Sequence, residues 1–134
     1  MNYVLDACAI IAFLRNEPGA DVVRNVLLGP SHTVFVHAVN LCEVYYDFFR
    51  AAGERTARSA IRDVSRVGVR TRRDMGQSFW REAGRIKAIY RKVSLADCFA
   101  ITLANRLGAE IVTLDHHEMD PLAASGVCKV LFIR

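Results

Sequence analysis

Short apolar runs alternate with longer segments of helical periodicity along the whole chain. The short runs are rich in β-branched and aromatic residues, which favour the extended backbone of a buried strand. We expect five strands, at residues 3–5, 33–36, 67–69, 111–113 and 127–132.

Between the strands, apolar residues recur three and four positions apart, which is typical of helices with one face in a core. The predicted helices cover residues 7–14, 18–28, a segment that ends at 52, then 54–66, 74–90 and 94–107. Short strands that alternate with amphipathic helices favour a mostly parallel sheet covered on both faces. The predicted class is therefore α/β, and the length of 134 residues predicts one domain over residues 1–134.

Composition places the chain among ordinary globular proteins, with 52% hydrophobic and 24% charged residues. No apolar run approaches the roughly 20 residues of a membrane span, and we expect a soluble, cytoplasmic protein with no membrane partner. The four cysteines show no CxxC spacing and are expected to be reduced, buried packing residues. They are Cys8, Cys42, Cys98 and Cys128.

Four acidic residues stand where a strand or an apolar run gives way to a helix. They are Asp6, Glu43, Asp97 and Asp115. In a parallel sheet the carboxyl ends of all strands lie along one edge, where ligands bind, so these distant residues could form one site. Carboxylates gathered there would need a cation, and a set of oxygen ligands favours Mg²⁺ or Mn²⁺ over zinc.

Each acid also has an ordinary structural interpretation as a helix cap. The matching patterns are Asp6 alone, Asn40-x-x-Glu43, Ser94-x-x-Asp97 and Asp115-x-x-Glu118. Capping and clustering are compatible, because helices that directly follow parallel strands begin at the same sheet edge. Considered together, the four acids favour a functional site.

The basic residues are concentrated in the middle of the chain, which has a formal net charge of +4. Thirteen of the 18 Lys and Arg residues lie between Arg50 and Lys92. Within this stretch an arginine stripe repeats at helical spacing and consists of Arg55, Arg58, Arg62 and Arg66. It is either a solvated helix face or, if the acidic site is real, a surface that binds the phosphates of RNA.

A divalent ion held by carboxylates can activate water and neutralise charge on a phosphodiester. With this chemistry in view, the chain resembles the PIN domain ribonucleases and, within them, the VapC-like toxins of toxin–antitoxin pairs. The segments that carry the resemblance are Tyr3-Val4-Leu5-Asp6-Ala7, Leu41-Cys42-Glu43-Val44, Ser94-Leu95-Ala96-Asp97-Cys98-Phe99-Ala100 and Val112-Thr113-Leu114-Asp115-His116-His117-Glu118. The resemblance implies a three-layer α/β/α sandwich with a central sheet of four to five strands. It also implies an endoribonuclease that depends on Mg²⁺ or Mn²⁺.

The resemblance assigns roles to the acids. Asp6 and Asp97 would bind the metal directly, Asp115 would bind the same or a second ion, and Glu43 would hold the water that the metal activates. Thr113 would orient the site.

The resemblance also implies further elements of the system. Glu118 would be a weaker, peripheral member of the site. The implied partners are RNA, a second copy of the chain and a small antitoxin. Exposed aromatic residues in the segment Tyr45-Tyr46-Asp47-Phe48-Phe49 are compatible with such protein contacts.

Other functions fit the sequence less well. An aspartyl-phosphate phosphatase needs a second Asp two residues after the first, where this chain has Cys8, and no glycine-rich nucleotide loop occurs. The remaining alternative is a catalytically weak PIN-like module that binds RNA or protein. That alternative predicts the loss of one or more acids, and all four are present.

Overall fold

The structure, a computed structural model, describes residues 1–134 as seven helices and five strands. The first half of the chain contains β1 (Asn2–Leu5), α1 (Ala7–Leu14), α2 (Ala20–Leu28), β2 (Thr33–His37), α3 (Ala38–Ala52) and α4 (Glu54–Arg66). The second half contains β3 (Arg70–Arg72), α5 (Gln77–Ile89), α6 (Leu95–Leu107), β4 (Glu110–Thr113), α7 (His116–Ala124) and β5 (Lys129–Phe132). None of the helices is both long enough and apolar enough to cross a bilayer.

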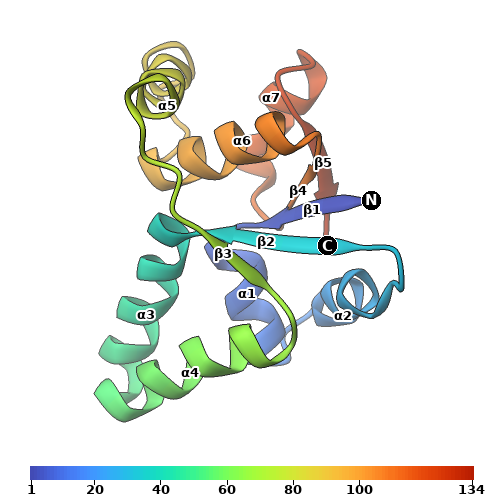
Figure 1. Cartoon of the computed structure of the whole chain (residues 1–134), viewed down its shortest axis with the longest axis vertical. Coiled ribbons are helices and arrows are strands. Elements are labelled where there is room, and N and C mark those ends of the chain that lie inside the picture. Colours follow the sequence, from blue (N-terminus) through green and yellow to red (C-terminus); the bar gives the residue numbers. More distant parts are fainter.

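All five strands pair in parallel in one sheet, in the order β3-β2-β1-β4-β5. Figure 1 shows α5, α6 and α7 on one face of this sheet and α1, α2, α3 and α4 on the other. The predicted α/β/α sandwich is therefore confirmed.

The sheet separates two apolar cores because successive strand residues point to opposite faces. In β1, Val4 joins the core under α5, α6 and α7, whereas Tyr3 and Leu5 join the core on the other face. In β4, Ile111 and Val112 divide in the same way. Strands buried on both faces read as continuous apolar runs, which is why the central strands could be recognised in the sequence.

The strand order reverses at the centre of the sheet, where β1 lies between β2 and β4. In open parallel sheets, the crevice at the carboxyl ends of the strands beside such a reversal is the usual place for a ligand. Asp6 follows β1 directly and Asp115 follows β4 after one further residue. The topology therefore brings these two residues to the same crevice.

The third strand differs from its predicted position, since it spans Arg70–Arg72 and not residues 67–69. Val67 ends α4, and Gly68 makes a turn with a φ of 93° that favours glycine. As an edge strand, β3 pairs only with β2 and carries polar, mostly exposed side chains, so it has no apolar pattern. The next helix, α5, begins three residues later than predicted, and Asp74 lies before it in an ion pair with Arg72 at 2.9 Å.

The sequence pattern predicts no range for α7, which spans nine residues. Pro121 lies inside this helix, and proline usually argues against a helix because it lacks the N–H of the backbone hydrogen bond. The capping pattern at Asp115 is the only sequence signal for α7.

One expectation about α3 is wrong, since Cys42 is exposed and not buried. Phe49, in the aromatic segment of this helix, is 45% exposed, and Ala52 is exposed as well. Figure 1 shows the reason, since α3 runs away from the sheet and its second half packs mainly beside α4. Among the other cysteines, Cys98 and Cys128 are buried as predicted, whereas Cys8 is only half-buried.

Candidate functional site

Asp6 is fixed by its neighbours at the end of β1. Its Oδ1 accepts a hydrogen bond from the backbone N–H of Ala9 at 2.9 Å, which caps α1 as predicted, and another from Cys8 Sγ at 3.0 Å. The side chain is almost completely buried, and its second oxygen, Oδ2, has no hydrogen-bond partner. One oxygen of Asp6 is therefore used locally, while the other is left for a ligand.

Thr113 connects the ends of β1 and β4. It is completely buried, and its Oγ1 accepts a hydrogen bond from the backbone N–H of Asp115 at 3.1 Å. The same hydroxyl lies 3.5 Å from Cys8 Sγ, which in turn donates to Asp6. Thr113 thus supports Asp115 directly and Asp6 through Cys8.

Asp97 lies in the first turn of α6, where Ser94 Oγ accepts a hydrogen bond from the Asp97 N–H at 3.2 Å. This is one half of the predicted capping box. In the other half of a capping box, the N–H of Ser94 would donate to the side chain of Asp97. In the structure this N–H donates instead to Glu118 Oε1 at 3.1 Å. This hydrogen bond ties the start of α6 to α7.

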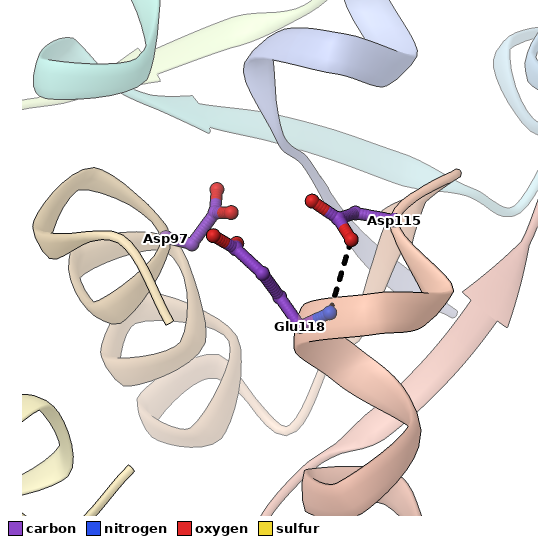
Figure 2. A group of neighbouring side chains, drawn as sticks. All are labelled: Asp97, Asp115 and Glu118. Atoms are coloured by element: carbon purple, nitrogen blue, oxygen red, sulfur yellow. Dashed lines mark hydrogen bonds between the residues drawn. The ribbon is translucent and has the colours of Figure 1, made fainter. Parts of the chain in front are cut away.

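Glu118, predicted as a peripheral member of the site, lies beside two of the other acids. Asp115 caps α7 by accepting a hydrogen bond from the N–H of Glu118 at 3.0 Å, as its capping pattern predicts. Figure 2 shows the Glu118 side chain reaching from α7 toward Asp97 on α6, with Asp115 beside it. One oxygen of each of these three carboxylates lies within 4.8 Å of the others. The D-x-x-E spacing was the sequence signal, but it does not reveal the reach of the side chain.

Glu43 approaches the same group from α3. This helix is capped by His37, whose Nδ1 accepts a hydrogen bond from the N–H of Val39 at 3.1 Å, so the predicted Asn40 capping box is wrong. Asn40 is instead buried and donates to the carbonyl of Ala96 at 3.1 Å. This bond ties α3 to the first turn of α6 and holds Glu43 near Asp97.

The pKa values show that the five acids influence one another. Burial raises the pKa of Asp6 to about 6, with a further contribution from the charge of Asp115. Burial also raises the pKa of Asp97 to about 6, with the charges of Asp6 and Glu43 acting in the same direction. The pKa of Glu118 rises to about 8 through burial and the nearby charges of Asp97 and Asp115, and the pKa of Glu43 is raised by burial and by the charge of Glu118. The sheet edge therefore concentrates negative charge in a poorly solvated place.

The residues present fit a divalent cation. None of the five acids forms an ion pair with a basic side chain. Three of their oxygens are buried without a hydrogen-bond partner: Asp6 Oδ2, Glu43 Oε1 and Glu118 Oε2. Ionised carboxylates crowded in this way repel strongly unless a proton or a cation neutralises them. A donor set made only of carboxylate oxygens suits Mg²⁺ or Mn²⁺.

The arginine stripe lies on the exposed side of α4. Arg55, Arg58 and Arg62 line one open hollow of about 430 Å³, together with Glu54. Arg66 differs from the other three, since it lies 3.8 Å from Asp63. Three arginines therefore present positive charge to solvent in one place.

The comparisons with known proteins agree with this architecture. The family model described as "PIN domain" matches residues 3–122, so the chain belongs to the PIN domain family. No curated protein matches the sequence.

Solved structures with this fold include toxin–antitoxin proteins. The chain is similar to a protein in the structure of VapBC2 from Rickettsia felis bound to a promoter DNA fragment, with a TM-score of 0.75, 14% identity and 98% coverage of both chains. For VapBC-1 of nontypeable Haemophilus influenzae the TM-score is 0.74 and the identity 18%, with 99% of this chain and 98% of that chain covered. For VapC20 of Mycobacterium tuberculosis, described as a sarcin–ricin loop cleaving toxin, the TM-score is 0.64 and the identity 15%, with 81% and 85% covered. At these identities the similarity shows the fold.

Proposed function

We propose that this protein is an endoribonuclease that depends on Mg²⁺ or Mn²⁺. The observation that carries the proposal is the group of five interacting acids, with three buried oxygens that have no hydrogen-bond partner, in the crevice of a PIN fold. RNA as substrate is supported by the description of VapC20 as a toxin that cleaves the sarcin–ricin loop. The exposed arginines of α4 are a suitable surface for an RNA backbone.

Each acid has a role in this proposal. Asp6, Asp97 and Asp115 hold the cation, which when bound activates water and neutralises charge on the phosphate. Glu43 orients the attacking water and accepts its proton, a task that its raised pKa favours. Thr113 keeps Asp6 and Asp115 in position.

Glu118 acts at the border of the site. It holds the start of α6 through the Ser94 N–H and offers its second oxygen to the cation.

The nuclease proposal is tested by incubating the protein with structured RNA and Mn²⁺, and then repeating the reaction with EDTA. Cleavage is expected with Mn²⁺ and not with EDTA. Asp6→Asn and Asp97→Asn should each abolish cleavage, because each removes a charge that holds the cation. Asp21→Asn, on the exposed side of α2, is the matched control and should cleave normally. Equal cleavage by the wild type and both site variants would contradict the proposal.

We further propose that the protein is a VapC-like toxin held inactive by a small antitoxin. Support comes from the toxin–antitoxin complexes among the structures that share its fold. Expression of the chain alone should then arrest bacterial growth, and Asp97→Asn should relieve the arrest while accumulating to the same level. Normal growth with abundant wild-type protein would contradict the toxin role.

A homodimer is the third part of the proposal. The exposed aromatic residues Tyr46 and Phe49 on α3, 46% and 45% exposed, are suitable for a contact between two copies. Light scattering of the purified protein should give twice the mass of one chain. A Tyr46→Ser, Phe49→Ser variant that stays dimeric would place the contact elsewhere.

A further inference from the structure

A small hollow lies beside the acidic group, between the turn that joins α5 to α6 and helix α7. Its volume is about 120 Å³, and residues from both segments line it. Tyr90, Arg91 and Lys92 come from the turn, and His117, Glu118 and Leu122 come from α7. None of the roles proposed above uses this hollow.

Glu118 forms a wall shared by the hollow and the acidic group. It lines the hollow, and one of its oxygens also lies within 4.8 Å of oxygens of Asp97 and Asp115. Glu118 is therefore common to the hollow and to the acidic group. A group bound in the hollow would be an immediate neighbour of a phosphodiester bound at the acids.

The turn that supplies the basic residues is held by hydrogen bonds. Lys87 Nζ donates to the carbonyl oxygens of Arg91 and Val93, each at 2.8 Å. The N–H of Val93 donates to the carbonyl of Tyr90 at 3.0 Å, and Val93 itself is buried. Because the backbone is already ordered, a ligand would lose little free energy in fixing it.

The charges at the hollow suit an anion. Arg91 and Lys92 are exposed, and neither forms an ion pair within the protein. His117 is also exposed and adds a ring N–H donor. These residues contrast with the acids on the other side of Glu118, which would repel a polyanion.

The interior of the hollow is different in character. Val93 and Leu122 are each 1% exposed and form apolar lining, and the ring of Tyr90 is partly buried beside them. Aromatic and apolar side chains bind nucleobases by stacking, without strong preference for one base. The volume is well below the roughly 300 Å³ at which pockets for drug-sized ligands begin, so it suits one base and not a larger ligand.

We propose that this hollow binds the nucleotide next to the cleaved bond, with its base against Tyr90 and its phosphate at Arg91 and Lys92. The proposal rests on the ribonuclease function proposed above and deepens it. Tyr90, Arg91 and Lys92 are binding residues that position the strand, so their loss affects the binding of RNA more than the chemical step.

The charge contribution is tested with the double variant Arg91→Glu, Lys92→Glu. Its control is Arg24→Glu, Lys129→Glu, which makes the same change in net charge at exposed residues that form no ion pair and lie in other elements. In cleavage of a short single-stranded RNA with Mn²⁺, the hollow variant should raise KM about tenfold and leave kcat within about twofold. A KM equal to that of the control would overturn the proposal.

The base contribution is tested with RNAs that carry one abasic nucleotide at successive positions around the cleaved bond. In the wild type, the abasic site directly beside the bond should raise KM about fivefold or more. In Tyr90→Ala the same abasic site should have little further effect, because the stacking contact is already lost. An equal penalty in both proteins would overturn the proposal. Thermal unfolding of each variant identifies any loss of folding.

These experiments separate the subsite from the nuclease function. Wild-type protein that fails to cleave any RNA with Mn²⁺ contradicts the nuclease and leaves the subsite to be judged by binding. Fluorescence anisotropy in EDTA then supplies the measurement, and the hollow variant should bind about tenfold more weakly than its charge-matched control. Normal cleavage with unchanged KM and binding in all variants would contradict only the subsite.

Discussion

At the scale of single residues, the site depends on side chains that do two things at once. Asp6 caps α1 with one oxygen and leaves the other without a partner. Glu118 holds the start of α6 with one oxygen and likewise has a buried second oxygen without a partner. The capping pattern visible in the sequence was therefore correct for Asp6 and Asp115, and it was also compatible with a ligand site. Capping alone could not have shown which oxygens remain free.

The raised pKa of Glu118 predicts how the metal-free protein responds to pH. Its pKa is about 8 in the folded protein, above its ordinary value of 4.5, so the folded state binds this proton more tightly than the unfolded state. The resulting stability is fully present below about pH 4.5 and is lost as the pH rises through about 8. Glu118→Gln cannot ionise and should remove part of this loss.

Thermal unfolding in EDTA at pH 6 and pH 9 provides the measurement. The fall in Tm between the two pH values should be several degrees smaller in Glu118→Gln than in the wild type. Glu54→Gln, an exposed residue at the start of α4, is the control and should follow the wild type. An identical fall in all three proteins would show that the Glu118 carboxyl does not carry the pH dependence.

Cys8 gives a second prediction at this scale. Burial and the charge of Asp6 raise the pKa of its thiol, so the thiol remains protonated and donates to Asp6 Oδ1. Residues that orient metal ligands typically change metal affinity by about 10–100-fold when removed. Cys8→Ala should therefore weaken Mn²⁺ binding by about this factor, whereas Cys8→Ser keeps a donor and should bind nearly as the wild type.

Calorimetric titration with Mn²⁺ measures these affinities. Cys42→Ala, which removes an exposed thiol from α3, is the control for the loss of a cysteine. If Cys8→Ala and Cys42→Ala bind Mn²⁺ equally well, the thiol of Cys8 does not support the site.

At the scale of helices and strands, the sequence predicts best the elements whose burial requires an apolar pattern. The strands β1, β2 and β4 are apolar because both faces of the sheet are covered, and their positions were predicted closely. The edge strand β3 contains Arg70, Thr71 and Arg72, so nothing in its composition distinguishes it from a loop. Helix α7 was not predicted because it contains Pro121, a residue that argues against a helix. Tertiary packing maintains the helix in spite of this local preference.

The same limits apply to the candidate site. Asp6, Glu43, Asp97 and Asp115 could be grouped because parallel topology places strand ends and helix starts at one edge. The place of Glu118 depends on α7 turning back over the start of α6, and this contact between distant segments has no local signal.

The turn before α2 provides a prediction for one element. Gly19 has a φ of 100°, and a Cβ at this position would lie 2.9 Å from the carbonyl oxygen of Ile133. Gly19→Ala should therefore destabilise the protein by about 1–3 kcal/mol, through backbone strain and displacement of the C-terminal residues. Gly84→Ala is the matched control, because Gly84 lies inside α5 and a Cβ there would meet no atom within 4 Å.

Denaturant unfolding measures the change in the free energy of unfolding, which should have opposite signs in Gly19→Ala and Gly84→Ala. Gly84→Ala should stabilise the protein by about 0.5–1 kcal/mol, since alanine favours a helix interior more than glycine does. A Gly19→Ala protein as stable as the wild type would mean that the turn and Ile133 adjust without cost.

At the scale of the whole molecule, charge is divided between two regions. The acids meet in one crevice, whereas 13 of the 18 basic residues lie between Arg50 and Lys92. This stretch contains both the arginines of α4 and the basic turn after α5. The formal net charge of +4 does not reveal that the acidic and basic residues lie in separate regions. This separation suits a protein that binds a polyanion with its basic residues and a cation with its acidic residues.

The last prediction concerns the arginines of α4. If Arg58 and Arg62 each contact an RNA phosphate, each contact releases counterions from the RNA. The affinity for RNA then falls as the salt concentration rises. The double variant Arg58→Glu, Arg62→Glu should bind single-stranded RNA more weakly at low salt. Its plot of log affinity against log salt concentration should be shallower by about 1.4, at roughly 0.7 for each lost contact. Anisotropy in EDTA, from about 50 to 200 mM salt, measures this slope without cleavage. The control is again Arg24→Glu, Lys129→Glu, and a slope equal to that of the control would return the stripe to a solvated helix face.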